Sequence, residues 1–307
     1  MLDGRTQIKI SVLVSLYHGQ EYLEGFFNAL NRIDSPETLE LIIIHNDPVT
    51  DELEIISRYK QMSRISIVHD IVNNRESLYS SWNRGIRLAR GPYIAIWNVD
   101  DVRLPDSLKR QSHILDKHSD VFFTYGDQIE IQMYGESDGR QVCFPEFHEH
   151  PELFISGFHL GCFPMWRKAL HDIAGYFDEQ FKSAGDYEFF VRVVKNCSGK
   201  KTEGVLGYYL ASQGISKTGS VNNIERTFVE LRYAQYQKLN YVYLLPALIR
   251  YRILRILSYG MNYRVGQFFP NYQFYRISRI YTIPVGLLLF PFRHLFPMIW
   301  RKLSRYA

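Results

Sequence analysis

Apolar segments of strand length that lack polar alternation constrain the fold of this chain more than any other feature. Ile8–Leu16 and Leu39–His45 are apolar runs rich in β-branched residues, and Tyr93–Trp97 is a third apolar run. A strand that is apolar on both sides must be buried on both faces, as in parallel sheets that are covered by helices. The sequence therefore predicts a sheet at the centre of a layered α/β domain.

Amphipathic helices are predicted between these runs. Apolar residues recur at helical spacing after the first run and again within Ser77–Ala89, which ends just before Gly91. Further strands are predicted at Ile65–His69 and Val121–Tyr125. A helix is predicted at Leu104–Leu115, between the apolar run Tyr93–Trp97 and the strand Val121–Tyr125. This alternation of strands and helices predicts a Rossmann-like α/β fold with a mainly parallel sheet and helices on both faces.

Acidic residues follow two of the apolar runs directly. Asp47 comes after the second run, and Asn98, Asp100 and Asp101 come after Tyr93–Trp97. The carboxyl ends of parallel strands share one edge of a sheet, so these residues are expected to converge there. Carboxylates at such an edge can hold a divalent ion that clamps a diphosphate. The alternative is an ordinary turn, because Asn and Asp are common turn residues.

Two frequent phosphate-binding motifs are missing from the sequence. No G-x-G-x-x-G follows the first strand, and no G-x-x-x-x-G-K-S/T occurs anywhere in the chain. Both a dinucleotide-binding fold and a P-loop are therefore disfavoured. Phosphate binding in this chain is expected to depend on a metal.

Four segments resemble, in the right order, the motifs of the family-2 glycosyltransferases, which have the GT-A nucleotide-sugar-binding fold. The resemblance extends from Lys9 to Gln213 and lies in ISVLVSLYHGQEYL, LELIIIHNDPVTD, SLYSSWNRGIRLARGPYIAIWNVDD and GYFDEQFKSAGDYEFFVRV. Ser15 and His18 stand where the family usually has Pro and Asn. Only the second Asp of the family's Asp-Asp pair is kept, as Asp47.

The resemblance implies roles for individual residues on the donor side. Asp47 would accept a hydrogen bond from the nucleotide base, with capping of the following helix as the alternative. Asp100 would ligate Mg²⁺ or Mn²⁺ between the two phosphates, supported by Asn98 and Asp101. The full set of nucleotide-sugar-binding residues implied in this way is Ser15, Tyr17, Asp47, Tyr79, Asn83, Asn98 and Asp101.

Asp186 is the catalytic base that the resemblance implies. Inverting transfer needs a group that takes the proton of the acceptor hydroxyl opposite the departing diphosphate. The family has a Glu-Asp pair at this point, and this chain has Gly185 and Asp186. A helix N-cap is the alternative role for Asp186, and the two roles are compatible.

Charge divides the chain near residue 230. All 32 acidic residues lie within 1–230, whereas 231–307 holds 12 lysines and arginines, no acid and half of the 22 tyrosines. We therefore expect a glycosyltransferase domain over 1–230 and an amphipathic helical tail over 231–307. Basic and aromatic residues together suit an anionic membrane surface. A packed helical subdomain is the alternative, and nucleic-acid binding ranks last because the long aliphatic runs would serve no purpose there.

These features predict an inverting glycosyltransferase. It would move a sugar from a nucleotide-diphosphate donor, UDP-linked by expectation, to a hydroxyl of a glycan or lipid-linked glycan. The alternatives are a polyprenyl-phosphate sugar transferase and a catalytically weak nucleotide-sugar-binding scaffold protein. Three widely spaced cysteines and no apparent signal peptide favour a reduced, cytoplasmic setting on the inner face of the cell membrane.

Overall fold

The computed structural model describes residues 7–34, 36–151, 153–211, 225–226 and 229. The chain divides into two compact units, one of residues 1–179 and 189–214 and the other of residues 180–188 and 215–307. The predicted domain boundary at residue 230 and the predicted membrane-associating tail fall outside the described residues. Within the described ranges, no helix is both long and apolar enough to cross a membrane.

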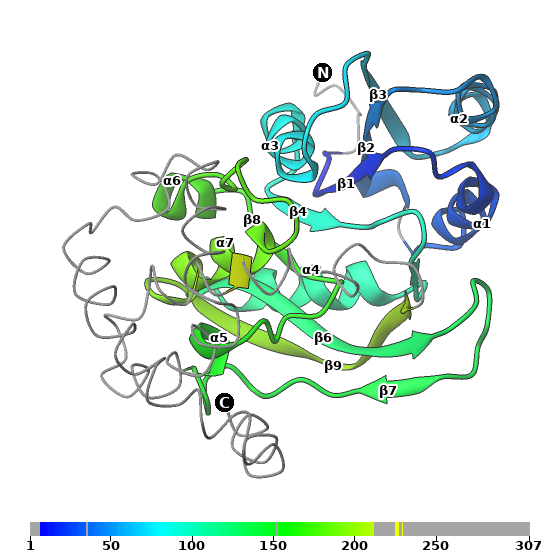
Figure 1. Ribbon diagram of the computed structural model, residues 1–307. Coiled ribbons are helices and arrows are strands. Elements are labelled where there is room, and N and C mark those ends of the chain that lie inside the picture. Colours follow the sequence, from blue (N-terminus) through cyan, green and yellow to red (C-terminus); the bar gives the residue numbers. More distant parts are fainter. Residues whose placement is uncertain (1–6, 35, 152, 212–224, 227–228, 230–307) are drawn as a thin grey trace, which may run out of the picture. The chain divides into compact units, whose positions relative to one another are not determined.

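The first unit is built on a nine-stranded sheet with helices packed on it (Figure 1). The strands are β1 (Ile10–Leu16), β2 (Leu39–Asn46), β3 (Ser66–Val72), β4 (Tyr93–Ile96), β5 (Val102–Arg103), β6 (Val121–Ile131), β7 (Arg140–Val142), β8 (Met165–Arg167) and β9 (Ser198–Leu210). The helices are α1 (Gln20–Leu30), the short 3₁₀ helix η1 (Pro36–Thr38), α2 (Thr50–Met62), α3 (Leu78–Leu88), α4 (Ser107–Lys117), α5 (Leu153–Ser156), α6 (Leu170–Ala174) and α7 (Gly185–Val194). Residues 185–188 of α7 belong to the second unit.

The sheet is mixed: the prediction of a mainly parallel sheet holds for β1 to β4 and for the pair β6 and β9, but it is wrong for β5, β7 and β8. The strand order is β3-β2-β1-β4-β8-β6-β9-β5, with β7 beside β6. The first four strands are parallel, but β8 is antiparallel to both β4 and β6, and β5 is antiparallel to β9. The segments of β5 and β8 are too short to show any periodicity in the sequence, so pattern reasoning had no signal for them.

Both faces of the parallel half are covered, as the unbroken apolar runs predict. All eight residues of β2 are buried. Alternate residues of β1, such as Val12 and Val14, share one core with apolar residues of α1, α2 and α4. Leu13 faces the other side, where α3 approaches so closely that a Cβ on Gly85 would lie 3.2 Å from its side chain. Figure 1 shows α3 on one side of these strands and α1 and α2 on the other.

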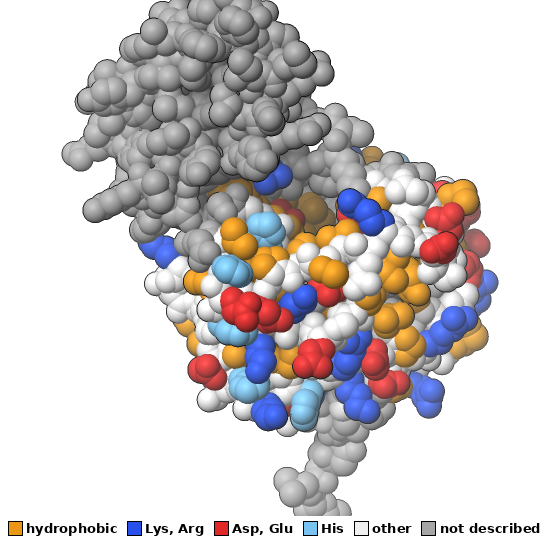
Figure 2. All heavy atoms as spheres, turned by 90° about the horizontal axis from the view of Figure 1, so that it is seen from below, with side chains coloured by type: hydrophobic (Ala, Val, Ile, Leu, Met, Phe, Trp, Pro, Cys, Tyr) orange, Lys and Arg blue, Asp and Glu red, His pale blue; other side chains and the backbone are white. Residues whose placement is uncertain are grey.

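The surface of the described residues adds little to the stability of this core. Figure 2 shows acidic and basic side chains interspersed with apolar ones on one face. The ion pair between Lys9 and Asp116 is typical: its N···O distance is 2.6 Å, but both side chains are more than a third exposed. Exposed pairs of this kind usually contribute less than about 1 kcal/mol, so burial of the sheet dominates.

A buried histidine fixes the position of β8. The Trp166 indole N–H donates to His171 Nε2 at 2.9 Å, and His171 Nδ1 lies 2.9 Å from the Gly175 carbonyl oxygen. Because the indole can only donate, Nε2 must accept, and the proton of the neutral ring sits on Nδ1. Burial is the main cause that lowers the pKa of His171 from 6.5 to about 4.

We expect His171 to make the stability of the protein depend on pH. The unfolded chain binds a proton at this site below pH 6.5, but the folded protein does so only below about pH 4. The stabilising contribution is therefore complete above pH 6.5 and is lost as the pH falls to about 4, by up to about 3 kcal/mol. Urea unfolding at several pH values should show a flatter pH dependence for His171→Gln. The same substitution at the exposed His113 should leave the dependence unchanged, and an equal slope for all three proteins would contradict the assignment.

Candidate functional site

The strand ends that were predicted to converge do lie at one edge of the sheet. Leu16 at the end of β1 pairs with His45 near the end of β2, and Leu13 pairs with Ile96 at the end of β4. Tyr17 follows β1, Asp47 follows β2, and the segment 97–101 follows β4. The candidate site is therefore assembled at the carboxyl ends of three neighbouring parallel strands.

Tyr17 is an exposed aromatic residue whose ring contacts two other side chains. Its ring stacks on the ring of His18 with centroids 4.1 Å apart, and the guanidinium of Arg75 lies 3.7 Å from its centroid. Its exposed fraction of 37% leaves the side chain accessible at the sheet edge. Ser15, two residues earlier, is a half-buried position of β1 paired with Ile44. Arg75 has no motif of its own, so sequence reasoning missed it.

Asp47 turns the chain out of the sheet and leaves its side chain exposed. Its φ of 48° lies in the left-handed region, and its backbone N–H donates to the Val72 carbonyl at 2.9 Å. The N-cap of α2 is Val49, so the alternative role of Asp47 as the helix cap is wrong. Its carboxylate forms no hydrogen bond or ion pair with any residue in the described part of the chain, and both of its oxygens can accept from a ligand.

Tyr79 and Asn83 lie on the buried side of α3. Tyr79 is 1% exposed and packs on Phe177, with ring centroids 5.9 Å apart. Asn83 donates to the Phe177 carbonyl at 2.9 Å and to Glu179 at 2.8 Å, and it accepts from the Phe177 N–H at 3.0 Å. Asn83 therefore ties the segment 177–179 to α3.

The turn after β4 gives its two carboxylates different environments. Asp101 is 1% exposed, and its oxygens accept from the Asn98 amide at 3.2 Å and from the Leu210 N–H at 3.3 Å. Asp100 is half-buried, and its carboxylate has no ion-pair partner among the residues that the structure describes. Asp101 thus has protein partners for both oxygens, whereas Asp100 is available to a ligand.

Electrostatics at this turn favour a cation. Burial raises the pKa of Asp100, and burial together with the neighbouring Asp100 charge raises the pKa of Asp101 well above its usual range. No cluster of three or more metal-ligating side chains occurs in the described ranges. A hard divalent ion bound through Asp100 would therefore take its other ligands from water and a diphosphate, which suits Mg²⁺ and Mn²⁺.

Tyr134, in the turn between β6 and β7, also lies close to these carboxylates. Its ring centroid is 5.1 Å from that of Tyr22, and its hydroxyl is buried without a hydrogen-bond partner among the described residues. Burial first, and then the charges of Asp100 and Asp101, raise its pKa to about 12. No sequence motif marks this turn, and sequence reasoning missed it.

Asp186 lies in the second unit. It occupies the first turn of α7, and its carboxylate accepts from the Tyr187 N–H at 2.8 Å. The N–H groups of Lys182, Ser183 and Ala184 just before the helix donate instead to the buried Glu225, at 2.8–2.9 Å. Glu225 is a second acidic residue that the sequence did not single out.

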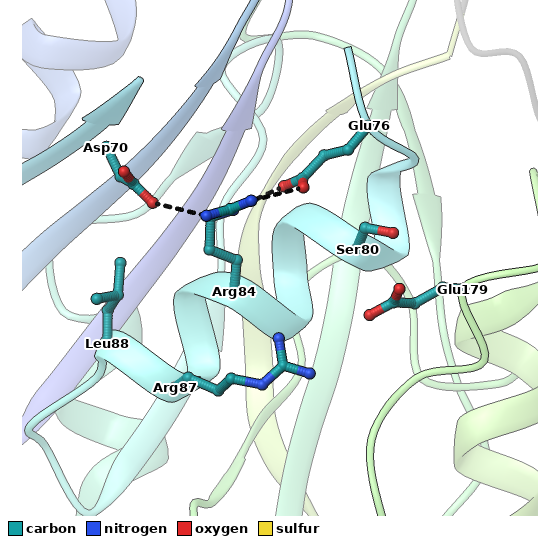
Figure 3. A pocket seen from close by; sticks show the side chains of 7 residues that line it. All are labelled: Asp70, Glu76, Ser80, Arg84, Arg87, Leu88 and Glu179. Carbon is teal, nitrogen blue, oxygen red and sulfur yellow. Dashed lines mark hydrogen bonds and ion pairs between the residues drawn. The ribbon is translucent and has the colours of Figure 1, made fainter. Parts of the chain in front are cut away.

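A separate pocket of about 420 Å³ lies along α3 (Figure 3), and its lining includes none of the predicted site residues. Arg84 is bound there through two nitrogens to Glu76 at 3.1 Å and lies 3.6 Å from Asp70. The other lining residues are Ser80, Arg87, Leu88 and Glu179. Paired charges of both signs make this a polar surface groove rather than a site for a diphosphate.

The sequence matches a known protein family. The sequence model described as "Glycosyl transferase family 2" matches residues 11–173. The poly(ribitol-phosphate) β-N-acetylglucosaminyltransferase TarS of Staphylococcus aureus is 26% identical over 215 residues, which are 67% of this chain and 36% of TarS. A glycosyltransferase of Methanocaldococcus jannaschii is 25% identical over 203 residues, 61% of this chain and 65% of that protein. The chain thus matches less than two thirds of the length of either relative.

Solved structures show the same fold. Staphylococcus aureus TarS 1-349 in complex with UDP-GlcNAc has a TM-score of 0.59 at 18% identity, covering 80% of this chain and 71% of that chain. The mannosyltransferase PcManGT from Pyrobaculum calidifontis, in complex with GDP-Man and Mn²⁺, has a TM-score of 0.53 at 12% identity, covering 97% and 84%. At these identities the likeness establishes a GT-A fold and nothing finer.

The two carboxylates of the turn predict an unusual response to mutation. Because its folded pKa is raised, Asp101 favours the folded state at low pH and opposes it as the pH rises from 3.8 through the folded value. Asp101→Asn keeps an acceptor for the Leu210 N–H and removes the buried charge. Without divalent metal, we expect this variant to be more stable than the wild type at pH 7 by about 1 kcal/mol or more, with the gain shrinking toward pH 4.

Asp116 provides the matched control for this measurement. Lys9 and Tyr93 donate to its carboxylate at 2.6 and 2.8 Å, and although burial acts to raise its pKa, these bonds hold the value below the usual range. Asp116→Asn should therefore destabilise the protein at pH 7 in the same urea titrations. Destabilisation by both substitutions would show that the Asp101 charge is compensated in the folded state.

Proposed function

Because the chain belongs to glycosyltransferase family 2, we propose that it moves a sugar, with inversion, from a UDP-linked donor to a hydroxyl of a glycan or lipid-linked glycan. The observation that carries this proposal is the convergence of Tyr17, Asp47 and Asp100 at the carboxyl ends of β1, β2 and β4. TarS is a related enzyme with UDP-GlcNAc bound in its crystal structure. This relation supports a UDP-sugar as the donor here.

Donor binding is proposed to use the exposed residues of this edge. Tyr17 offers an aromatic face to the nucleoside, and Asp47 offers a carboxylate whose oxygens are not used by the described residues. Asp100 would hold Mg²⁺ or Mn²⁺ against the diphosphate, with Asn98 and Asp101 fixing the turn. The bound ion would supply neutralisation of the charge that develops on the leaving diphosphate. The Mn²⁺ in the complex of PcManGT supports this choice of metal.

The chemical step is proposed to use Asp186. The oxygen of the acceptor hydroxyl forms a bond to the anomeric carbon as the bond from that carbon to the diphosphate oxygen breaks. The proton of the hydroxyl passes to the Asp186 carboxylate, so the charges balance and the nucleoside diphosphate leaves as an anion. Support comes from the place of Asp186 in the first turn of α7, where a carboxylate is favoured by the helix dipole.

Donor turnover tests the proposal directly. With Mn²⁺, the full chain should release nucleotide from one member of a panel of UDP- and GDP-sugars, and calorimetry should show Mn²⁺-dependent binding of UDP. Asp100→Ala should weaken that binding at least tenfold with the melting temperature preserved, because it removes the proposed metal ligand. Asp120→Ala, on an exposed loop, should match the wild type. Equal metal-dependent affinity in all three proteins would remove Asp100 from the metal site.

Asp186→Asn separates base catalysis from a structural role. The amide keeps the shape of the side chain and can still accept from the Tyr187 N–H, but it cannot take the proton. We expect kcat to fall by roughly 10² or more with UDP affinity unchanged. Asp172→Asn, in the first turn of α6, serves as the control and should retain kcat. A joint loss of UDP affinity and melting temperature in Asp186→Asn would instead assign Asp186 to the fold.

A further inference from the structure

We propose that Glu52 is a positioning residue for the donor nucleotide, because it holds in place both turns that carry Tyr17 and Asp47. Its side chain lies on the first turn of α2 and is fully buried. The Gly19 N–H donates to Oε1 at 2.6 Å, and the Val49 N–H donates to Oε2 at 3.4 Å. One carboxylate therefore bridges the turn after β1 and the turn after β2. The inference rests on the proposed function, since it assigns Glu52 to the same donor site.

Both turns contain a residue with a positive φ. His18 has a φ of 49° and Asp47 a φ of 48°, and these are the two non-glycine residues with positive φ among the described residues. The left-handed conformation is less favourable than the right-handed one for a residue with a Cβ, although Asp and His adopt it more readily than most, so neighbouring hydrogen bonds help to hold it. Gly19 directly follows His18, and Val49 lies two residues after Asp47. Each bond to Glu52 therefore acts beside a residue with a positive φ.

A histidine pair fixes the orientation of the Glu52 carboxylate from behind. His45 Nε2 lies 2.8 Å from Glu52 Oε2, and His45 Nδ1 lies 3.0 Å from His69 Nε2. A neutral imidazole has one N–H, and with that proton on Nε2 His45 donates to the Glu52 carboxylate. The hydrogen bonds thus run from His69 on β3 through His45 on β2 to Glu52 and on to the turn after β1. Glu52 cannot rotate without breaking this chain.

The connection to the ligand passes through the aromatic stack. The hydrogen bond of Gly19 supports the conformation of His18, and the His18 ring stacks on the Tyr17 ring. The Arg75 guanidinium also contacts the Tyr17 ring. Release of Gly19 would free His18 and with it the orientation of Tyr17. Release of Val49 would free the turn that aims Asp47. Loss of Glu52 is therefore expected to weaken nucleotide binding through two separate residues, Tyr17 and Asp47. Glu52 itself does not contact the nucleotide in this proposal.

The test compares donor affinity with turnover in the full chain. Glu52→Gln keeps one acceptor but cannot serve both turns and His45 at once, so the KM for the donor and the calorimetric Kd for UDP with Mn²⁺ should rise about tenfold or more. The kcat at saturating donor should change less than threefold. Glu54→Gln, two residues along the same helix and exposed, should leave both constants unchanged. Unchanged UDP affinity with a lowered melting temperature would show Glu52 to be a helix cap alone and overturn the inference.

Two further measurements keep the result decisive. Glu52→Asp retains the charge but is one methylene shorter, so it should also weaken UDP binding if Glu52→Gln does not fold. Amide hydrogen exchange without nucleotide should be faster at Gly19 and Val49 in a folded variant, and equal exchange would refute the bridging role. A wild-type chain that binds no UDP would refute the proposed function, while the exchange rates would still decide whether Glu52 holds the turns.

Discussion

Burial of the polar end of β2 is the constraint on which the site depends. His45 and Asn46 are enclosed with the rest of the strand, so each must find hydrogen-bond partners inside the protein. His45 is bonded to Glu52 of α2, while the Asn46 amide donates to Ser81 of α3 at 2.9 Å and accepts from the Glu76 N–H at 3.0 Å. The end of β2 thereby holds the first turns of α2 and α3, which lie on opposite faces of the sheet. Asp47 is the first residue after β2 whose side chain is exposed and can contact a ligand.

The mixed half of the sheet completes the acidic turn. Leu210 at the end of β9 donates its N–H to Asp101, and the Trp97 indole donates to the Asp101 carbonyl at 2.9 Å. Arg103 of β5 is buried, with its guanidinium bound to the Ile96 carbonyl at 2.9 Å, and burial lowers its pKa to about 10. Strands β5 and β9, which were not predicted from the sequence, thus hold in place the turn that carries Asp100.

The sequence predicted the parts of the molecule that depend on local pattern. The unbroken apolar runs were sufficient for β1, β2 and β4, and Asp47 and Asp100 followed from the rule that ligands gather at carboxyl strand ends. The partners that hold the site could not be predicted this way. In the sequence, Glu52 is one of several acidic residues on a polar helix, and Tyr134 is a single aromatic residue in a turn. Their roles become visible only in the fold, which brings distant segments together. Asn83 shows the same limit, because its motif was visible but its partners lie more than ninety residues away.

Burial and hydrogen bonding separate the structural carboxylates from those proposed to bind ligand. Glu40 on β2 is buried and accepts from Ser11 and Arg90, and these bonds lower its pKa although burial acts to raise it. Asp101 is similarly enclosed, but burial and the neighbouring Asp100 charge raise its pKa more than the Asn98 and Leu210 hydrogen bonds and the nearby Arg103 lower it. This imbalance makes an amide at position 98 favourable for the turn. An amide there can donate to Asp101, whereas a third carboxylate would add repulsion to a pair that already resists ionisation. The Asn98 amide therefore stabilises the turn, and Asp100 remains the carboxylate that we propose as the metal ligand.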